Sequence, residues 1–121
     1  MPNRQRIARI DHEVQRLLGT LISQELTDPR LGFVTVTRVD VSDDLRACKV
    51  FVSIIGDRED ARRSLAALHH AAGFLRGELG HRIALRYTPE LTFVEDRSAE
   101  RAIELAKDLR ADAQRRARAE Q

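Results

Sequence analysis

Residues 57–83, Asp-Arg-Glu-Asp-Ala-Arg-Arg-Ser-Leu-Ala-Ala-Leu-His-His-Ala-Ala-Gly-Phe-Leu-Arg-Gly-Glu-Leu-Gly-His-Arg-Ile, carry one unbroken apolar stripe. The spacing of three and four residues predicts a helix with one buried face. Asp57 is a suitable N-cap, with Asp60 as its partner at the helix start. Gly73 lies within this stretch without shifting the phase of the stripe, so we expect two helical segments joined by a kink near Gly73 rather than by a loop. The members of the stripe are Ala61, Leu65, Leu68, Ala72, Leu75, Leu79 and Ile83.

The sequence before this helix predicts one more helix and a hairpin. Apolar residues between Ile7 and Leu21 recur at helical spacing, which predicts a helix over residues 4–25. A loop follows at residues 27–32. Residues 33–41 and 48–54 are rich in β-branched residues and alternate, which is typical of two strands of an antiparallel hairpin. The alternation slips between Val36 and Val39, which is consistent with a bulge.

Strand character returns after the central helix. Residues 84–95 are expected to form a strand in which Pro89 marks an edge, an entry point or a bend. Ser98 is expected to cap a final helix that ends near Ala113, and the basic residues 114–121 are expected to fray because they lack apolar anchors. We therefore predict a single α+β domain over residues 1–113, in which helices cover the apolar face of a three-stranded sheet.

Composition limits the function classes. The formal net charge of this 121-residue chain is only +2, but 19 of its 21 basic residues are arginine, the side chain that binds phosphate bidentately. Cys48 is the only cysteine, which excludes an intramolecular disulfide and favours a reducing compartment. No apolar run is long enough to span a membrane, and no apolar signal-peptide stretch occurs at the start. These features predict a cytoplasmic protein.

The residue types that carry catalysis are not arranged for it. No pair of histidines has the helical spacing of a zinc site, and a single cysteine cannot build a zinc knuckle. Cys48 shares a strand face with Val50 and Val52 and is expected to pack in the core. No phosphate-binding loop or nucleophile elbow is present. We therefore expect a protein that is not an enzyme and that has no metal or cofactor.

The face of the central helix opposite its apolar stripe suggests a binding surface. Cations alternate there with residues that have almost no side chain, an arrangement that admits a sugar-phosphate backbone. A solvated helix face with tolerated glycines is the alternative. Residues 77–80, Gly-Glu-Leu-Gly, match the G-x-x-G clamp of KH domains, but Glu78 would repel phosphates and Leu79 belongs to the buried stripe, so we interpret the match as coincidence. This face carries Arg62, Ala66, His69, Gly73, Arg76 and Gly80, flanked by Arg63, His70 and Gly77.

Three stretches in order resemble bacterial ribosome-binding factor A. They are residues 39–53, with Val-Asp-Val-Ser-Asp-Asp-Leu at their start, residues 72–80, and residues 85–93, Leu-Arg-Tyr-Thr-Pro-Glu-Leu-Thr-Phe. The resemblance implies a type II KH-like fold, α-β-β-α-kink-α-β, in which an Ala-x-Gly kink, here Ala71-Ala72-Gly73, replaces the G-x-x-G loop. It also implies binding to the 30S subunit and its 16S rRNA, late 16S rRNA processing and cold adaptation. Two departures, Cys48 in place of the usual alanine and the unexpected Gly77, leave the rigidity of the binding helix open.

Together these observations predict a monomeric ribosome assembly factor that binds stoichiometrically. The RNA contacts expected from charge placement alone are Arg4, Arg6, Arg9, Arg46, Lys49, Arg62, Arg76, Arg82 and Arg86. One alternative is a protein-interaction module that docks a partner through its sheet edge or C-terminal helix, with little dependence on salt. The other is a small hydrolase or nuclease, for which a credible acid–base pair is missing.

Overall fold

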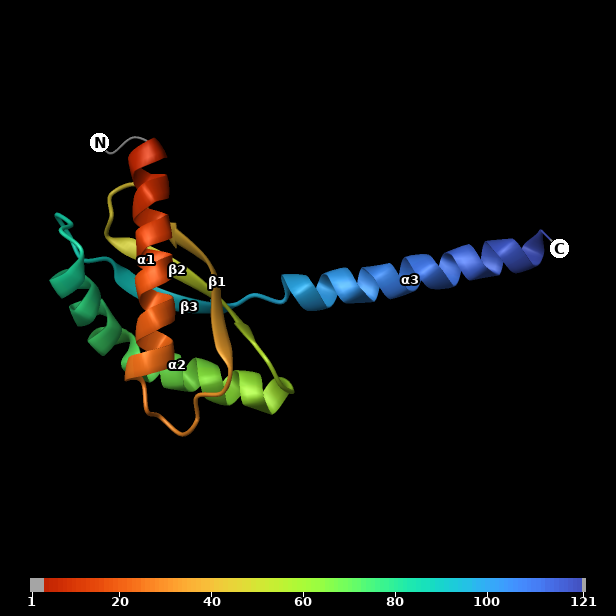
Figure 1. Ribbon diagram of the computed structural model, residues 1–121, viewed down its shortest axis with the longest axis horizontal. Helices are drawn as coiled ribbons and strands as arrows, with labels where there is room; N and C mark the ends of the chain where they lie inside the picture. Colours follow the sequence, from red (N-terminus) through yellow and green to blue (C-terminus); the bar gives the residue numbers. More distant parts are fainter. Residues whose placement is uncertain (1–3, 121) are drawn as a thin grey trace.

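The computed structural model describes residues 4–120 and contains three helices and three strands (Figure 1). Residues 1–3, at the start of the predicted domain, and Gln121, the end of the predicted tail, lie outside the described residues. The order along the chain is α1 (Arg4–Glu25), β1 (Val34–Val41), β2 (Ala47–Ile54), α2 (Arg58–Arg82), β3 (Glu90–Glu95) and α3 (Ser98–Ala119).

The sheet has the order β1-β2-β3, with β2 in the centre. β1 and β2 form the predicted antiparallel hairpin, and the predicted bulge is present where the register shifts between Val36 and Arg38. β3 pairs parallel with β2, so α2 is the connection that carries the chain back to the start of β2. The prediction of a strand over residues 84–95 is wrong in its first half, because β3 begins only at Glu90, after Pro89, which has no N–H to donate to a ladder. Pro89 is therefore the entry point of the strand.

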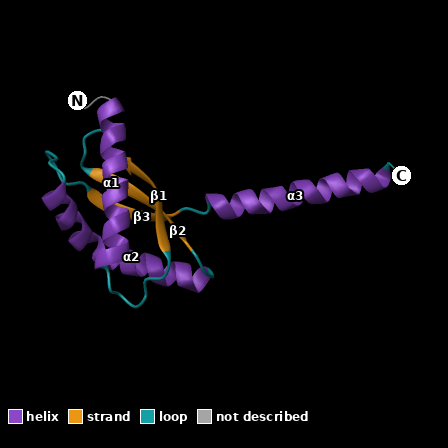
Figure 2. Ribbon diagram, viewed as in Figure 1, coloured by secondary structure: helices purple, strands orange, loops and turns teal. Residues whose placement is uncertain are grey.

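The core lies between the sheet and the helices α1 and α2 (Figure 2). The inward side chains of the strands pack against the apolar faces of the two helices, and the most deeply buried members include Val14, Leu18, Val50 and Leu68. Cys48 belongs to this core, as predicted from its strand face. The result is the predicted α+β two-layer arrangement with a KH-like fold.

Helix α2 runs unbroken from Arg58 to Arg82, so no loop interrupts it at Gly73. It changes direction in its middle, green part (Figure 1). The predicted capping box is present: Asp57 accepts a hydrogen bond from the N–H of Asp60 at 2.8 Å, and Asp60 accepts one from the N–H of Asp57 at 3.0 Å. Gly73 does not adopt a backbone conformation that favours glycine, because its φ lies outside the left-handed region.

Helix α3 extends away from the rest of the molecule (Figure 1), and none of its residues is buried. It ends later than predicted, at Ala119 rather than near Ala113, because its many alanines and arginines favour a helix without tertiary contacts and Asp112 pairs with Arg115 one turn on. The capping prediction for Ser98 is also wrong, since the N-cap is Arg97 and Asp96 accepts the N–H of Ser98 at 2.9 Å. The division into a domain of residues 1–113 and a tail stays a prediction. No helix within residues 4–120 is long and apolar enough to cross a membrane.

Candidate nucleic-acid interface

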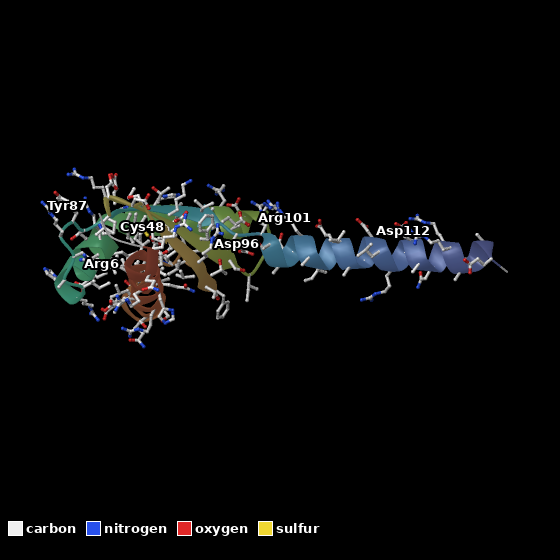
Figure 3. The ribbon with its side chains drawn as sticks, turned by 90° about the horizontal axis from the view of Figure 1, so that it is seen from above. Arg6, Cys48, Tyr87, Asp96, Arg101 and Asp112 are labelled. Carbon is white, nitrogen blue, oxygen red and sulfur yellow. The ribbon has the colours of Figure 1, made fainter. Side chains whose placement is uncertain are left out.

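Three segments that are distant in the sequence meet at Tyr87. They are the start of α1, the turn between β1 and β2, and the loop between α2 and β3, and Figure 3 shows Arg6 and Tyr87 at the same end of the molecule. They enclose a hollow of about 510 Å³. We call it the Tyr87 hollow; it is lined by Arg6, Asp43, Asp44, Leu45, Arg46, Arg86 and Tyr87.

Two guanidinium groups lie against the ring of Tyr87. The guanidinium carbon of Arg46 is 4.5 Å from the ring centre and that of Arg86 is 5.6 Å away, both within the range of cation–π attraction. A guanidinium that stacks on a ring keeps its N–H groups in its own plane, where they can donate to a phosphate. The ring is 38% exposed, so part of it is also open to a ligand. The arrangement combines cations with an aromatic face, the two features that bind a nucleotide.

The turn between the strands holds Arg46 in place. Leu45 has a positive φ of 63°, a conformation that is rare outside glycine, and its side chain is only 6% exposed. Asp44 accepts hydrogen bonds from the hydroxyl of Ser42 at 2.7 Å and from the N–H of Arg46 at 3.1 Å, and these bonds lower the pKa of its carboxyl group. A tied turn with a buried leucine at its tip fixes the point from which Arg46 reaches Tyr87. The carboxylates of Asp43 and Asp44 make the turn side of the hollow less favourable to phosphate than the Arg86 side.

A glycine-lined groove continues from the Tyr87 hollow along the outer face of α2. It has a volume of about 570 Å³ and shares Arg86 and Tyr87 with the hollow. A Cβ atom added at Gly73 or Gly77 would meet nothing within 4 Å, so the helix backbone is open to close approach there. The groove is lined by Gly73, Arg76, Gly77, Gly80, His81, Arg86, Tyr87 and Thr88.

Arg76 joins the groove to the loop that carries Tyr87. Its Nε and Nη2 both donate to the carbonyl oxygen of Thr88, at 3.2 and 3.0 Å. The loop is also close to Gly80, where an added Cβ would lie 3.0 Å from the hydroxyl of Thr88. Arg76 therefore positions the loop as well as adding positive charge to the groove.

The structure brings together four of the nine arginines and lysines predicted to contact RNA, namely Arg6, Arg46, Arg76 and Arg86. Arg62 pairs with Glu59 and lies about 21 Å from Arg76 along α2. Arg82 pairs with Glu78 at 3.4 Å, which reduces the charge that it offers to a ligand. The other three are exposed and lie outside the Tyr87 hollow and the glycine-lined groove: Arg4 and Arg9 on α1, and Lys49 on β2.

Tyr87 is at the centre of this surface, but the charge pattern of the sequence does not single it out. We expected it inside a strand, whereas it lies in the loop before β3. The signal in the sequence was that the only tyrosine of the chain follows Arg86 directly. The G-x-x-G match at residues 77–80 lies inside α2 with Leu79 buried, as expected for a coincidence, although Gly77 and Gly80 do line the groove.

The thiol of Cys48 lies in the core and is only 1% exposed. Burial raises its pKa to about 12, and the nearby charges of Asp11 and Asp40 act in the same direction. A thiol with such a pKa is protonated at neutral pH and is a poor nucleophile. Within residues 4–120, no three His, Cys, Asp or Glu side chains are grouped closely enough to hold a metal ion.

The architecture and this surface define a small KH-like domain with a surface on which arginines gather around an aromatic ring. Comparison with known proteins gives its family: the model for "Ribosome-binding factor A" matches residues 6–109. The chain belongs to the ribosome-binding factor A family.

Relatives and solved structures agree with this assignment. Ribosome-binding factor A of Desulfitobacterium hafniense is 48% identical over 84% of this chain and 82% of its own length, and that of Heliobacterium modesticaldum is 48% identical over 86% of each chain. The crystal structure of the Thermus thermophilus factor superimposes with a TM-score of 0.67 at 33% identity, covering 76% of this chain and 98% of that chain. A homology model of the Thermus thermophilus factor, fitted into a cryo-EM map of a 30S complex, gives a TM-score of 0.62 at 34% identity over 75% and 96% of the two chains.

Proposed function

We propose that this protein binds the 30S ribosomal subunit through 16S rRNA and assists its late maturation in the cytoplasm. The observation that carries the proposal is the pairing of Arg46 and Arg86 with Tyr87, next to a groove in which glycines expose the helix backbone. A related factor has been fitted into a map of a 30S complex, which supports the same partner here. Membership of the family supports the role in ribosome assembly.

The mechanism that fits this surface is stoichiometric binding. Arg46, Arg76 and Arg86 donate to phosphates, Tyr87 offers a ring face to a base, and the glycines admit the sugar-phosphate backbone. Such a protein changes rRNA only by binding one conformation better than another. That mechanism accounts for a role in 16S rRNA processing and in growth in the cold, because a bound factor shifts the population toward the conformation that is ready for the next maturation step. It requires no cofactor, and a monomer carries the whole surface.

The direct test is the affinity for purified 30S subunits, measured by co-sedimentation. We expect Arg86→Gln to weaken binding roughly ten- to 150-fold, because a hydrogen bond to a charged group contributes roughly 1.5–3 kcal/mol. Arg110→Gln is the matched control, because it removes the same charge from the exposed helix α3. Equal binding by Arg86→Gln and wild type would remove the Tyr87 hollow from the interface.

Salt dependence separates RNA binding from the alternative of a protein-docking module. Helix α3 favours that alternative, because it exposes Ile103, Leu105 and Leu109. If four arginines neutralise four phosphates, the 30S affinity should fall roughly fifty- to 150-fold between 50 and 200 mM salt. A flat response, together with loss of binding on deletion of residues 98–121, would assign the interaction to α3 instead.

A further inference from the structure

Two large apolar side chains are exposed at the end of the sheet opposite the Tyr87 hollow. Phe33 is 78% exposed and Ile55 is 72% exposed, whereas their strand neighbours Val36 and Ile54 are buried. The backbone N–H of Ile55 donates to the carbonyl of Phe33 at 3.1 Å, just beyond the last pair of the hairpin. The turn that carries Arg46 closes the other end of the same hairpin, so the two surfaces are separated by its full length.

The backbone around Phe33 is tied down, so its exposure is not that of a loose loop. The N–H of Gly32 donates at 3.0 Å to the hydroxyl of Ser64, which is 1% exposed, and this bond joins the loop to α2. The N–H of Leu31 donates to the carbonyl of Asp28 at 3.0 Å. An aromatic ring held in solvent by fixed backbone is preorganised to receive a flat partner.

The surroundings of Phe33 are cationic. A hollow of about 270 Å³ lies beside it, and the charged side chains that line it are Arg30, Arg63 and Asp60. Arg30 is held by the carboxylate of Asp28 at 2.8 Å. Arg63 is in none of the ion pairs found among residues 4–120, although its charge helps to lower the pKa of Glu59. Asp60 is engaged in the capping box of α2. Beside the exposed ring of Phe33, the charged side chain that is not engaged in such an ion pair or cap is therefore a cation, Arg63.

We propose that Phe33, Ile55 and Arg63 form a second RNA-contact site, which binds one unpaired nucleotide of the rRNA. The base stacks on Phe33 against Ile55, and Arg63 donates to the adjoining phosphate. Every base has a face that stacks on an aromatic ring, and an Arg beside the ring suits the charged backbone. This inference rests on the proposed binding to rRNA and adds that the protein holds two separate RNA segments. Arg63 and Gly80 are about 26 Å apart along α2.

The absence of tryptophan from the chain makes the stacking directly observable. Phe33→Trp places a single indole at the site, and stacking of a base should quench its fluorescence. The probe is a short single-stranded oligoribonucleotide of mixed sequence, compared with a blunt-ended RNA duplex that contains the same strand. Phe74→Trp is the matched control, because Phe74 is also an exposed phenylalanine but lies on α2 outside this hollow. We expect quenching for Phe33→Trp with the single strand and much less with the duplex or with Phe74→Trp.

The second measurement is 30S affinity by co-sedimentation. Phe33→Leu keeps an apolar side chain without the ring and should weaken binding roughly five- to 150-fold, the equivalent of about 1–3 kcal/mol for one stacked base. Arg63→Gln should reduce the slope of log affinity against log salt by about one. Both residues are exposed, and circular dichroism verifies that each variant is folded.

The outcomes distinguish this site from the proposed function. Normal 30S binding by Phe33→Leu, with no quenching of Phe33→Trp, overturns the second site, while loss of binding by Arg86→Gln still supports the first. Weakened 30S binding by Phe33→Leu without quenching by either RNA also overturns it, because the surface then contacts a ribosomal protein. Quenching together with weakened 30S binding supports it.

Discussion

Replacing Gly73 by alanine should raise stability and weaken binding, two effects that a purely structural glycine would not combine. Gly73 lies in the interior of α2, is exposed, and lines the glycine groove. Its φ is outside the left-handed region, and a Cβ atom would meet nothing within 4 Å. Alanine therefore fits the folded chain without strain, and the methyl group projects into the space that a sugar-phosphate backbone would occupy.

The expected magnitudes follow from these facts. Glycine in a helix interior costs about 1 kcal/mol relative to alanine, so the free energy of unfolding should rise by about that amount and Tm by roughly 4 °C. A methyl group that crowds a close contact costs about 1–3 kcal/mol, which corresponds to a loss of roughly five- to 150-fold in 30S affinity.

Thermal denaturation and 30S co-sedimentation of the same samples test both parts. Gly19→Ala is the matched control, because Gly19 is inside α1, has open space at its Cβ position, and lies outside the groove. It should give the gain in stability without the loss of binding. Unchanged 30S affinity for Gly73→Ala would refute the idea that RNA approaches the helix backbone. A lower Tm would show instead that the bend of α2 needs glycine.

Two further predictions concern single side chains. Burial and a pKa of about 12 should protect the Cys48 thiol from reaction with a disulfide reagent. At pH 8 the reagent should label Cys48 only after denaturant unfolds the protein. Fast labelling of the native protein would contradict the place of Cys48 in the core. Hydrogen bonds from Ser98 and Thr37 lower the pKa of Asp96 to about 2, so the stability that Asp96 contributes is complete above about pH 4 and is lost as the pH falls through about 2. The free energy of unfolding, measured by denaturant titration, should therefore fall less steeply between pH 4 and pH 2 in Asp96→Asn than in wild type. If the free energies of the two proteins fall in parallel with pH, the carboxylate of Asp96 is not preferentially hydrogen-bonded in the folded state.

The elements with strong periodicity were predictable because local pattern and burial coincide in them. The apolar stripe from Ala61 to Ile83 predicts α2, and Asp57 with Asp60 predicts the cap at its start. The break in the alternation between Val36 and Val39 predicts the bulge in β1. The prediction that the last helix, α3, ends near Ala113 is wrong, because a helix does not require apolar anchors. Its alanines, its arginines and the pair of Asp112 with Arg115 favour a helix without any buried face.

The proposed binding surface was predictable only in part, because the sequence does not show which cations lie close together in the folded chain. The parallel pairing of β2 with β3 brings Arg46 and Tyr87 together across a long sequence separation, and no local pattern encodes that contact. Glu59 precedes Arg62 by three residues on one helix, so the sequence does allow the ion pair that reduces the charge Arg62 offers to RNA to be predicted. The exposure of Phe33 depends on where β1 begins, a boundary that alternation of residue types does not fix.

The topology of the sheet also sets the order in which the binding surface is built during synthesis. β1 and β2 pair across a short turn, but β3 joins them only after the whole of α2 has crossed over, and contacts of such high sequence separation form late. The bond from the N–H of Glu90 to the carbonyl of Arg46, at 2.8 Å, is the first that β3 makes with this side of β2, next to the Arg46–Tyr87 contact. A nascent chain that has not yet released Glu90 from the exit tunnel contains the hairpin and most of the arginines but has no Tyr87 hollow. The Tyr87 hollow is therefore completed only after the whole of α2 and the start of β3 are free to fold.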